Sequence, residues 1–581
     1  MKRAGRALQL LLLVVISFAA FAGSYLYSQE DFYVNSDLPW HNAVLDSQGR
    51  LLAWYHPEQN MGYDQFMRLD WDFLEHKVPI SDKTGLKVYL SYPIFDGKTL
   101  QGWTYWQHNP ASTYAHLVDA LVRWYPYSGD EESIAVVRGM LDYHLAHGTT
   151  PSDWEWANVP FATACGGDKE YGHCLKDMPK EFYGGIETDK IGELGMAYVL
   201  FYEMTGDRKY LDAGVKCADA LAKHVRPGDA THTPWPFRVD AHTGDVIATE
   251  QYGGMIVAPV RLFDELMRIG EGDAASYKKA RDMAWKWILD NPLNKMSEAY
   301  DKWSGYYEDI PKDLVNVNDM TSMMTAYYIL SQDDPSKVDP AWRSDVGFLL
   351  DRSRALLGRG PFFGAWAIDE QVRPDGGIAG EAEPKYVPAG GALLGPVSRV
   401  CCSRAGLVCR TSQWGAINAM FYEKTNDGQA RENAFRSLNY ATYFAGSDGK
   451  ISCCGQWKDA GGDKNWFEDG YSDAGRSFMW ALAAVPAFAP KGQDHLLNSS
   501  STVQKVKYSA RRVEYKTFDH SGREILRLSF VPVKVTAGSA ALAKRDDLDG
   551  EGYTVSALTG NDYVVNVNHA NSNEVVIEGK P

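Results

Sequence analysis

A short motif recurs along this chain and constrains its fold more than any other feature. Two seven-residue segments match closely, FYEMTGD at 201–207 and FYEKTND at 421–427, and weaker copies occur at 127–130, 270–273 and 331–334. Each copy lies where one helical pattern ends and another begins. Gly or Asn suits the left-handed position after a helix, and the Asp that follows suits the N-cap of the next helix. The repeat therefore predicts a series of helical hairpins.

The segments beside these motifs have the period of amphipathic helices. Ile191, Leu194, Tyr198 and Phe201 recur at steps of three and four residues, which places their side chains on one face of a helix. The same pattern predicts helix pairs along most of the chain, and a sixth pair begins near Tyr471. The five complete pairs span 112–147, 188–225, 251–290, 316–357 and 411–445.

Two kinds of connection alternate along the chain. Tight turns join the helices within a pair, whereas loops of roughly 20 to 55 residues join one pair to the next. Loops of this length inside a compact domain are usually functional or disordered. These loops are rich in Trp, Tyr, His and carboxylates, which favours function. We therefore predict a ring of hairpins with tight turns on one face and functional loops on the other.

The remaining segments divide the chain into four parts. Residues 1–29 have a basic start and an apolar run, which predicts either a cleaved signal peptide or an uncleaved membrane anchor. Either interpretation makes this an exported protein that is periplasmic, extracellular or anchored by its N-terminal segment. Residues 30–100 are expected to wrap the ring, and 101–490 to form it. The β-rich segment 491–581 predicts an antiparallel sheet or sandwich.

The chain contains eight cysteines, and an even number in an exported protein suggests disulfides. Cys165 and Cys174 are expected to close one loop. Cys217 lies within a helical pattern and is expected to be a buried thiol. The spacing matches no zinc site, so no metal is predicted. The cysteines that could bridge between two other loops are Cys401, Cys402, Cys409, Cys453 and Cys454.

Charge and missing motifs exclude several classes of function. The formal net charge is -16, which argues against a nucleic acid partner because phosphate binding needs a basic surface. The sequence has no HExxH, no GxGxxG after a strand, no Walker-type loop and no GxSxG elbow. We accordingly predict no cofactor, and contact with a membrane only through the possible N-terminal anchor.

This order of elements resembles the (α/α)6 toroid of the six-hairpin glycosidases over residues 100–485. A toroid followed by a β module also resembles several polysaccharide lyases, and helical toroids occur in sugar epimerases and terpene cyclases. The resemblance lies in the architecture and the hairpin motif, and no family-specific catalytic signature is matched. It implies a mainly α fold, a carbohydrate substrate, and a cleft at the loop-bearing ends of the inner helices.

Carboxylates stand near the start of several inner helices. Glycosidic hydrolysis needs one carboxyl group that stays protonated and one that is ionised, and acids from different hairpins can converge across a ring. Each such acid can also be explained as a helix N-cap or as a favourable charge at a helix start. The candidate catalytic residues are Glu187, Asp189, Glu250, Asp319 and Asp469.

Aromatic and basic residues in the same loops are candidates for binding the substrate. Aromatic rings can stack on the apolar faces of sugars, although a packed structural loop would contain the same residues. Arg238 could hold a carboxylate through a bidentate contact or form a structural ion pair. The candidate substrate-binding residues are Trp103, Trp106, His108, Trp154, Tyr183, Arg238, Tyr252 and Trp414.

Three functions are consistent with this pattern. The first is a glycoside hydrolase that cleaves an oligo- or polysaccharide with paired carboxylates. The second is a lyase for a uronate-containing polymer, in which a Tyr or His base acts beside a neutralised carboxylate. Tyr183, Tyr252, His108, His232 and Arg238 could supply those roles. The third is a non-catalytic carbohydrate-binding or envelope scaffold protein.

Overall fold

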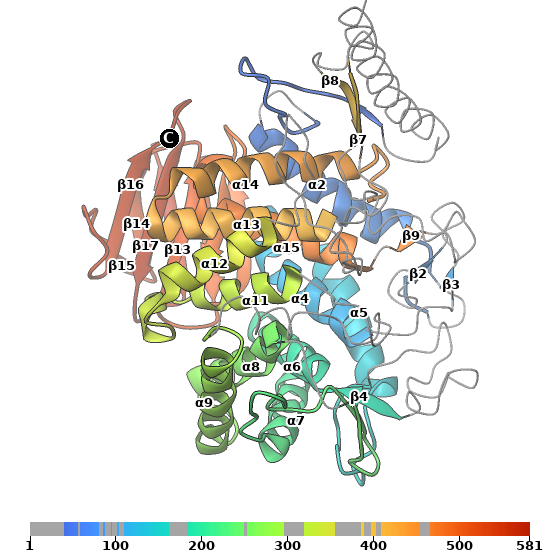
Figure 1. Cartoon of the computed structure of the whole chain (residues 1–581). Helices are drawn as coiled ribbons and strands as arrows, with labels where there is room; N and C mark the ends of the chain where they lie inside the picture. The colour runs from blue at the N-terminus through green and yellow to red at the C-terminus, as the bar shows by residue number, and fades with distance from the viewer. Residues whose placement is uncertain are drawn as a thin grey trace, which may run out of the picture.

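Six inner helices form a closed ring in the part of the chain that the structure describes (Figure 1). Each helix contacts the next one along the chain, and the last contacts the first. Their N-terminal ends follow the long loops, as the sequence predicts. The inner helices are α4 (Pro110–Ser128), α6 (Thr188–Thr205), α8 (Val257–Ile269), α11 (Asp319–Leu330), α13 (Val408–Thr425) and α15 (Glu468–Ala484).

The computed structural model describes most of the chain between Trp40 and Lys580. The segments within these limits that it does not describe are 56–58, 81–84, 88–93, 96–101, 104–109, 162–183, 249–252, 295–318, 355–384, 389–396, 402–407, 452–464 and 467.

Five outer helices follow their inner partners through the tight turns that the repeat predicts. Gly206 and Gly270 adopt left-handed backbone angles after α6 and α8, and Asn426 does so after α13. Asp207 and Asp427 then cap the next helix with their side chains. The predicted hairpins and the toroid are therefore confirmed. The outer helices are α5 (Glu131–His147), α7 (Arg208–His224), α9 (Ala274–Asp290), α12 (Trp342–Arg354) and α14 (Gly428–Ala441).

The sixth outer helix comes from the N-terminal segment. Helix α2 (Gln59–Asp72) packs against α15 and α14 and is followed by a short π-helix, η1 (Phe73–Lys77). Tyr63 on α2 donates a hydrogen bond to Asn439 on α14 at 2.6 Å, although 376 positions separate them. The segment expected to wrap the ring thus supplies the partner that completes the sixth pair.

Glycines allow the inner helices to approach closely. A Cβ on Gly192 of α6 would lie 2.4 Å from the backbone nitrogen of Pro259 and 2.5 Å from its Cδ, in the first turn of α8. No L side chain fits there unless the two helices separate. A contact of this kind explains why small residues occupy this position in an inner helix.

We predict that Gly192→Ala destabilises the ring by about 1–3 kcal/mol, the usual cost of overpacking. The measurement is the midpoint of urea unfolding. Gly347→Ala on α12 is the matched control, because a Cβ there meets nothing within 4 Å. In that open helical position alanine should be neutral or slightly stabilising. Equal midpoints for Gly192→Ala and the wild type would show that the helices do not need this close approach.

The C-terminal segment forms two antiparallel sheets that pack on each other, which confirms the predicted β module. Leu526 and Val565 from one sheet, with Val513 and Ile577 from the other, lie in one apolar core. The first sheet is β10 (His495–Ser499), β13 (Gly522–Leu528), β17 (Tyr563–His569) and β16 (Gly552–Ala557). The second is β11 (Val503–Ser509), β12 (Arg512–Thr517), β18 (Glu574–Gly579), β14 (Pro532–Ala537) and β15 (Ala540–Ala541).

The β module covers the face of the ring that carries the tight turns (Figure 1). His495 on β10 stacks on Tyr127 at the end of α4, with ring centroids 3.9 Å apart, and its Nδ1 lies 2.8 Å from the Tyr127 carbonyl oxygen. Tyr508 donates a hydrogen bond to the carbonyl oxygen of Pro126. The face with the tight turns is therefore the closed face of the ring, and we call the opposite face, where the inner helices begin, the open face.

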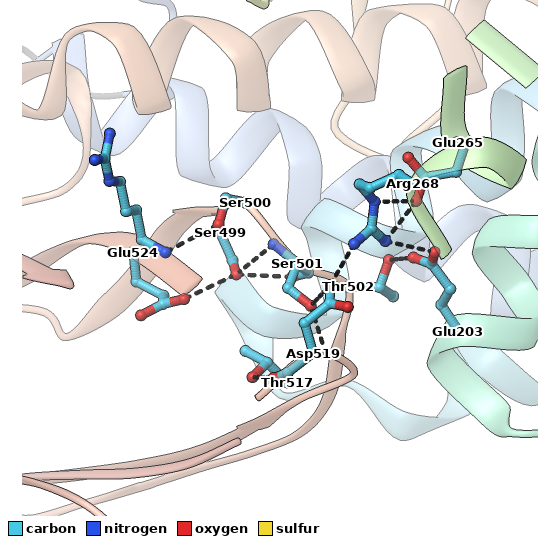
Figure 2. A network of polar contacts seen from close by, with 11 residues as sticks. Glu203, Glu265, Arg268, Ser499, Ser500, Ser501, Thr502, Thr517, Asp519 and Glu524 are labelled. Carbon is cyan, nitrogen blue, oxygen red and sulfur yellow. Dashed lines mark hydrogen bonds and ion pairs between the residues drawn. The ribbon is translucent and has the colours of Figure 1, made fainter. Parts of the chain in front are cut away.

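Arg268 on α8 joins the ring to the module within a cluster of carboxyl groups (Figure 2). Its guanidinium lies 2.8 Å from Glu203, 2.6 Å from Glu265 and 2.6 Å from Asp519 of the module. Thr502 of the module also donates to Glu203, at 2.5 Å. Burial and the nearby Glu265 raise the pKa of Glu203 well above its usual value. Glu203 is therefore harder to ionise than an exposed carboxyl group.

This arrangement predicts that docking of the module weakens with rising pH. A carboxyl group whose pKa is raised by folding stabilises the fold below its unfolded pKa, and that stabilisation is lost as the pH rises through the folded-state pKa. We expect Glu203→Gln to flatten the fall in melting temperature between pH 5 and pH 9. The amide can still donate to Glu265 but does not titrate. Glu271→Gln, at an exposed turn, is the control, and identical pH profiles for wild type and Glu203→Gln would contradict the prediction.

Short strands and 3-10 turns complete the described structure. Strand β4 (Gly185–Glu187) pairs with β5 (Arg238–Asp240), which pairs with β6 (Val246–Ala248). The other short strands are β1 (His41–Asn42), β2 (Ile94–Phe95), β3 (Gly102–Trp103), β7 (Lys385–Pro388), β8 (Val397–Cys401) and β9 (Asn465–Trp466). The 3-10 turns are η3 (Gly253–Ile256), η4 (Pro335–Lys337), η7 (Thr442–Phe444) and η9 (Pro486–Phe488).

Two cysteines have described side chains, and both are buried. Cys217 is the buried thiol that the sequence predicts, and burial raises its pKa to about 12. Cys409 lies in the buried first turn of α13, and its bridge stays a prediction. Cys401 ends β8, and its side chain is not described. The cysteines outside the described residues are Cys165, Cys174, Cys402, Cys453 and Cys454.

Among the described helices, none combines the length and apolar character needed to cross a membrane. The possible signal peptide or anchor at residues 1–29 lies outside the described residues.

Candidate active site

Glu187 lies at the open face, where β4 ends and α6 begins. Its side chain makes no capping hydrogen bond to the helix. It is fully buried and accepts from Arg238, its cross-strand neighbour on β5, through Nε at 2.8 Å and Nη2 at 2.7 Å. The explanation of Glu187 as a helix cap therefore does not hold. This ion pair instead fixes the short sheet against the start of α6.

Asp189 and Glu193 lie one turn apart on α6 and share a cation. The ammonium of Lys190 is 3.1 Å from Asp189 and 3.7 Å from Glu193. Asp189 is fully buried, and the Lys190 ammonium is the cation that faces its carboxyl group. Three charged side chains thus meet where water is excluded.

Their surroundings move the two carboxyl groups in opposite directions. Burial raises the pKa of Asp189 to about 7, because the nearby Glu187 and Glu193 add to the effect while Lys190 only partly opposes it. Burial also opposes ionisation of Glu193, but Lys190, His116 and Ser112 together bring its pKa below the usual value. Near neutral pH, Asp189 can therefore hold a proton while Glu193 is ionised.

His116 on α4 links this pair to α15, the neighbour of α4 on its other side. Its Nε2 lies 3.7 Å from Glu193, and its Nδ1 lies 3.1 Å from Asp473 on α15. Asp473 in turn contacts Arg476 at 2.6 Å and Arg410 of α13 at 3.9 Å. All of these side chains are nearly fully buried. Charged groups from four inner helices therefore meet inside the ring.

Asp119 lies deeper in the ring and holds three arginines together. Its carboxylate is 2.6 Å from Arg123, 3.5 Å from Arg261 and 3.6 Å from Arg476. Burial would raise the pKa of Asp119, but the three guanidinium groups hold it well below its usual range. A buried carboxylate with this many cations stays ionised and fixes their positions.

A small chamber lies between these groups. It has a volume of about 30 Å³, enough for a water molecule. Polar and charged groups on its walls come from His116, Asp119, Glu193, Arg261 and Arg476. A water molecule held here would touch an ionised carboxylate and a histidine, which are the groups that can activate it.

The structure brings together only part of the set of residues predicted from the sequence. Glu187, Asp189 and Arg238 meet at the start of α6. Trp154 is half-buried beside Phe161 and His242, and a Cβ on Gly184, just before β4, would be 3.8 Å from its ring. Trp154 therefore lies near the same strand.

Trp414 is placed elsewhere. It is buried in α13, and its indole nitrogen donates to the Leu350 carbonyl of α12 at 3.3 Å, so it joins an inner helix to its outer partner. The backbones of Trp103, Asp319 and Asp469 lie in β3, α11 and α15, and their side chains are not described. The predicted residues outside the described segments are Trp106, His108, Tyr183, Glu250 and Tyr252.

The sequence analysis did not select the residues that complete the cluster. They share one sequence pattern that could have indicated them. Charged or polar residues lie three or four positions apart on an inner helix. His116 and Asp119 show this spacing on α4, Asp473 and Arg476 on α15, and Asp189 with Glu193 on α6. Charged residues on the inward face of a helix with apolar neighbours are rarely buried without a reason.

Comparisons with known proteins concern the architecture alone. No protein-family model matches the chain, and no curated protein matches it. Among solved structures, a D-mannose isomerase is similar at 10% identity and a TM-score of 0.48, over 73% of this chain and 97% of that one. A cellobiose 2-epimerase from Spirochaeta thermophila is similar at 10% identity and a TM-score of 0.45, over 73% of this chain and 97% of that one.

A GH76A alpha-1,6-mannanase from Salegentibacter is similar at 11% identity and a TM-score of 0.39, over 73% of this chain and 99% of that one. Such values carry no conclusion about activity. The closed ring of paired helices described above gives this chain the six-hairpin (α/α)6 toroid architecture.

Proposed function

We propose that this chain is an exported carbohydrate-active enzyme, a glycoside hydrolase that acts at the open face of the ring. The observation that carries the proposal is the pair Asp189 and Glu193. They lie one turn apart, contact one ammonium, and have pKa values moved in opposite directions. Hydrolysis of a glycosidic bond needs such a pair, one carboxyl group to donate a proton and one carboxylate to act as base or nucleophile.

The roles follow from the surroundings of each group. Asp189 is the proton donor to the leaving oxygen, because burial raises its pKa to about 7 and so leaves part of it protonated at neutral pH. Glu193 is the ionised partner, and it borders the chamber that has room for a water molecule. His116, between Glu193 and Asp473, orients Glu193 from the side of the chamber. The ion pair of Glu187 with Arg238 holds the strand that leads into Asp189.

A second candidate, proton abstraction from a sugar carbon, is favoured by one observation. His116 lies between two carboxylates, an environment that suits a base. A lyase would also need a cation to neutralise a uronate carboxylate. Arg238 fits that role poorly, because Glu187 already accepts from both its Nε and its Nη2. For this reason we propose the hydrolase first and the lyase second.

The test uses the purified full chain and a panel of neutral and uronate-containing polysaccharides. A hydrolase releases new reducing ends without new ultraviolet absorbance, whereas a lyase product absorbs because of its new double bond. We expect reducing ends alone. Absorbing products would instead establish the lyase. Release of neither product from any polymer, with the fold intact, would favour a binding or scaffold protein and contradict the proposal.

A further inference from the structure

A polar groove separates the closed face of the ring from the β module. It consists of two adjoining cavities of about 610 and 740 Å³, which share Arg123, Tyr327, Ser331 and the segment 498–500. We call it the closed-face groove. Each cavity falls within the usual volume range of ligand sites, roughly 300 to 1,000 Å³. The groove lies at the opposite end of the ring from Asp189.

The ring side of the groove presents an aromatic pair with an unused donor. Trp480 on α15 stacks on Tyr327 of α11, with centroids 4.0 Å apart and planes at 21°. Trp480 is 4% exposed, and its indole N–H has no hydrogen-bond partner among the described residues. A buried donor without an acceptor is costly, at about 1–3 kcal/mol. An oxygen atom of a bound ligand would remove that cost.

The charges of the groove argue against an anionic ligand, because its lining carries seven carboxyl groups against seven cations, Lys337, Lys424 and Arg523 among them. Arg281 is paired with Asp264 at 2.9 Å, and Arg268 with Glu265 at 2.6 Å. Arg123 is likewise paired, at 2.6 Å from the Asp119 carboxylate. Arginines with carboxylate partners at these distances have little positive potential left for a phosphate, sulfate or uronate. The ligand that suits the groove is polar and uncharged.

The module side of the groove is built from hydroxyl and amide groups. The segment 498–502 contains one asparagine, three serines and one threonine, and Asn566 and Asn568 on β17 line one of the two cavities. Ser500 already accepts from the backbone N–H of Arg523 at 2.9 Å, so its O–H remains to be donated. The hydroxyls of Ser499, Ser501 and Thr502 donate to protein acceptors, so the Ser500 hydroxyl and the Asn566 and Asn568 amide oxygens are the groups that remain for sugar hydroxyls.

We propose that the closed-face groove binds a neutral oligosaccharide segment at the end of the ring away from Asp189, where Met196, Leu200 and Arg261 line both the groove and the small chamber. The choice of a sugar as ligand rests on the proposed function, whereas the neutral charge and the place of the site rest on the groove itself. Binding here would hold a long substrate on the enzyme while its other parts are cleaved at the open face.

The test is native affinity electrophoresis of the full chain in gels that contain galactomannan, mixed-linkage glucan or polygalacturonate. At least one neutral polymer should retard the wild type. Asn566→Ala and Trp480→Phe should each weaken that binding about tenfold, the effect of losing one hydrogen bond to the ligand. The Asn566 substitution should disturb the fold less than the Trp480 substitution, because Asn566 is only half-buried. The control is Lys534→Ala on the other sheet, whose side chain is 61% exposed.

Asp189→Asn separates this inference from the proposed function. It should be retarded as the wild type is, even when turnover is lost. Retardation with no turnover in the wild type would overturn the proposed hydrolase alone. Three results would overturn the proposal that the groove binds a neutral oligosaccharide. These are that no neutral polymer retards the wild type, that only polygalacturonate retards it, or that Asn566→Ala and Trp480→Phe both bind as tightly as the control.

Discussion

Asp189→Asn is expected to lower turnover of an identified polysaccharide by about 10²- to 10⁴-fold, the usual contribution of a positioned general acid. The amide has nearly the same size, so it fits the same buried position, but it has no proton to give to the leaving oxygen. The fold should survive, because the substitution removes a carboxyl group that burial makes hard to ionise. The measurement is the initial rate of reducing-end release, with circular dichroism to confirm folding.

The pH profile gives the same prediction a second readout. The donor works only when protonated, so kcat/KM should fall as the pH rises through about 7, the pKa that burial gives Asp189. The ionised Glu193 should not limit the rate at mildly acidic pH, because its pKa is lowered.

Asp212→Asn on the surface of α7 is the control, since its side chain is 58% exposed and pairs with Arg208. It should retain the full rate and the same pH profile as the wild type. If Asp189→Asn were as active as this control, Asp189 could not be the proton donor.

The second large effect should come from Asp119→Asn. This change leaves Arg123, Arg261 and Arg476 without their shared counter-ion, deep inside the ring. Removing one member of a buried ion pair typically costs about 3–5 kcal/mol, because the remaining charge stays buried and uncompensated. We expect the midpoint of urea unfolding to fall by a corresponding amount.

Asp282→Asn serves as its control, because that carboxylate is half-exposed and its pair with Lys278 is on the surface. Such pairs contribute about 0–1 kcal/mol. A second variant, Asp119→Asn with Arg261→Met, removes one of the stranded cations and should regain part of the lost stability. If Asp119→Asn unfolded at the same urea concentration as Asp282→Asn, the three arginines would not depend on Asp119.

The hairpins could be predicted because their signals are local. Gly206 adopts a left-handed backbone conformation and Asp207 caps the next helix, so adjacent residues determine the turn. The partner of α15 could not be found in the same way. Helix α2 precedes the whole ring in the chain, and no local pattern connects it with α15.

The candidate active site likewise combines residues that a local pattern predicts with residues that only the folded ring identifies. Glu187 and Asp189 could be selected because they stand at the start of a helix that follows a long loop. A single sequence cannot tell a capping acid from a catalytic one, and here the structure shows that Glu187 binds Arg238 instead of capping α6. Glu193 and His116 were missed because their importance depends on which helix face points inward, which only the assembled ring decides.

Helix α2 also has a consequence for how the protein is made. Tyr63 and its partner Asn439 are 376 positions apart, so at about 5–20 residues per second the ribosome needs about 20 to 75 s to supply the second after the first. During that time the apolar side of α2, with Phe66 and Trp71, has no α14 or α15 to cover it. The nascent chain therefore exposes the apolar side of α2 through most of its synthesis. Shielding by a chaperone would matter most for this segment.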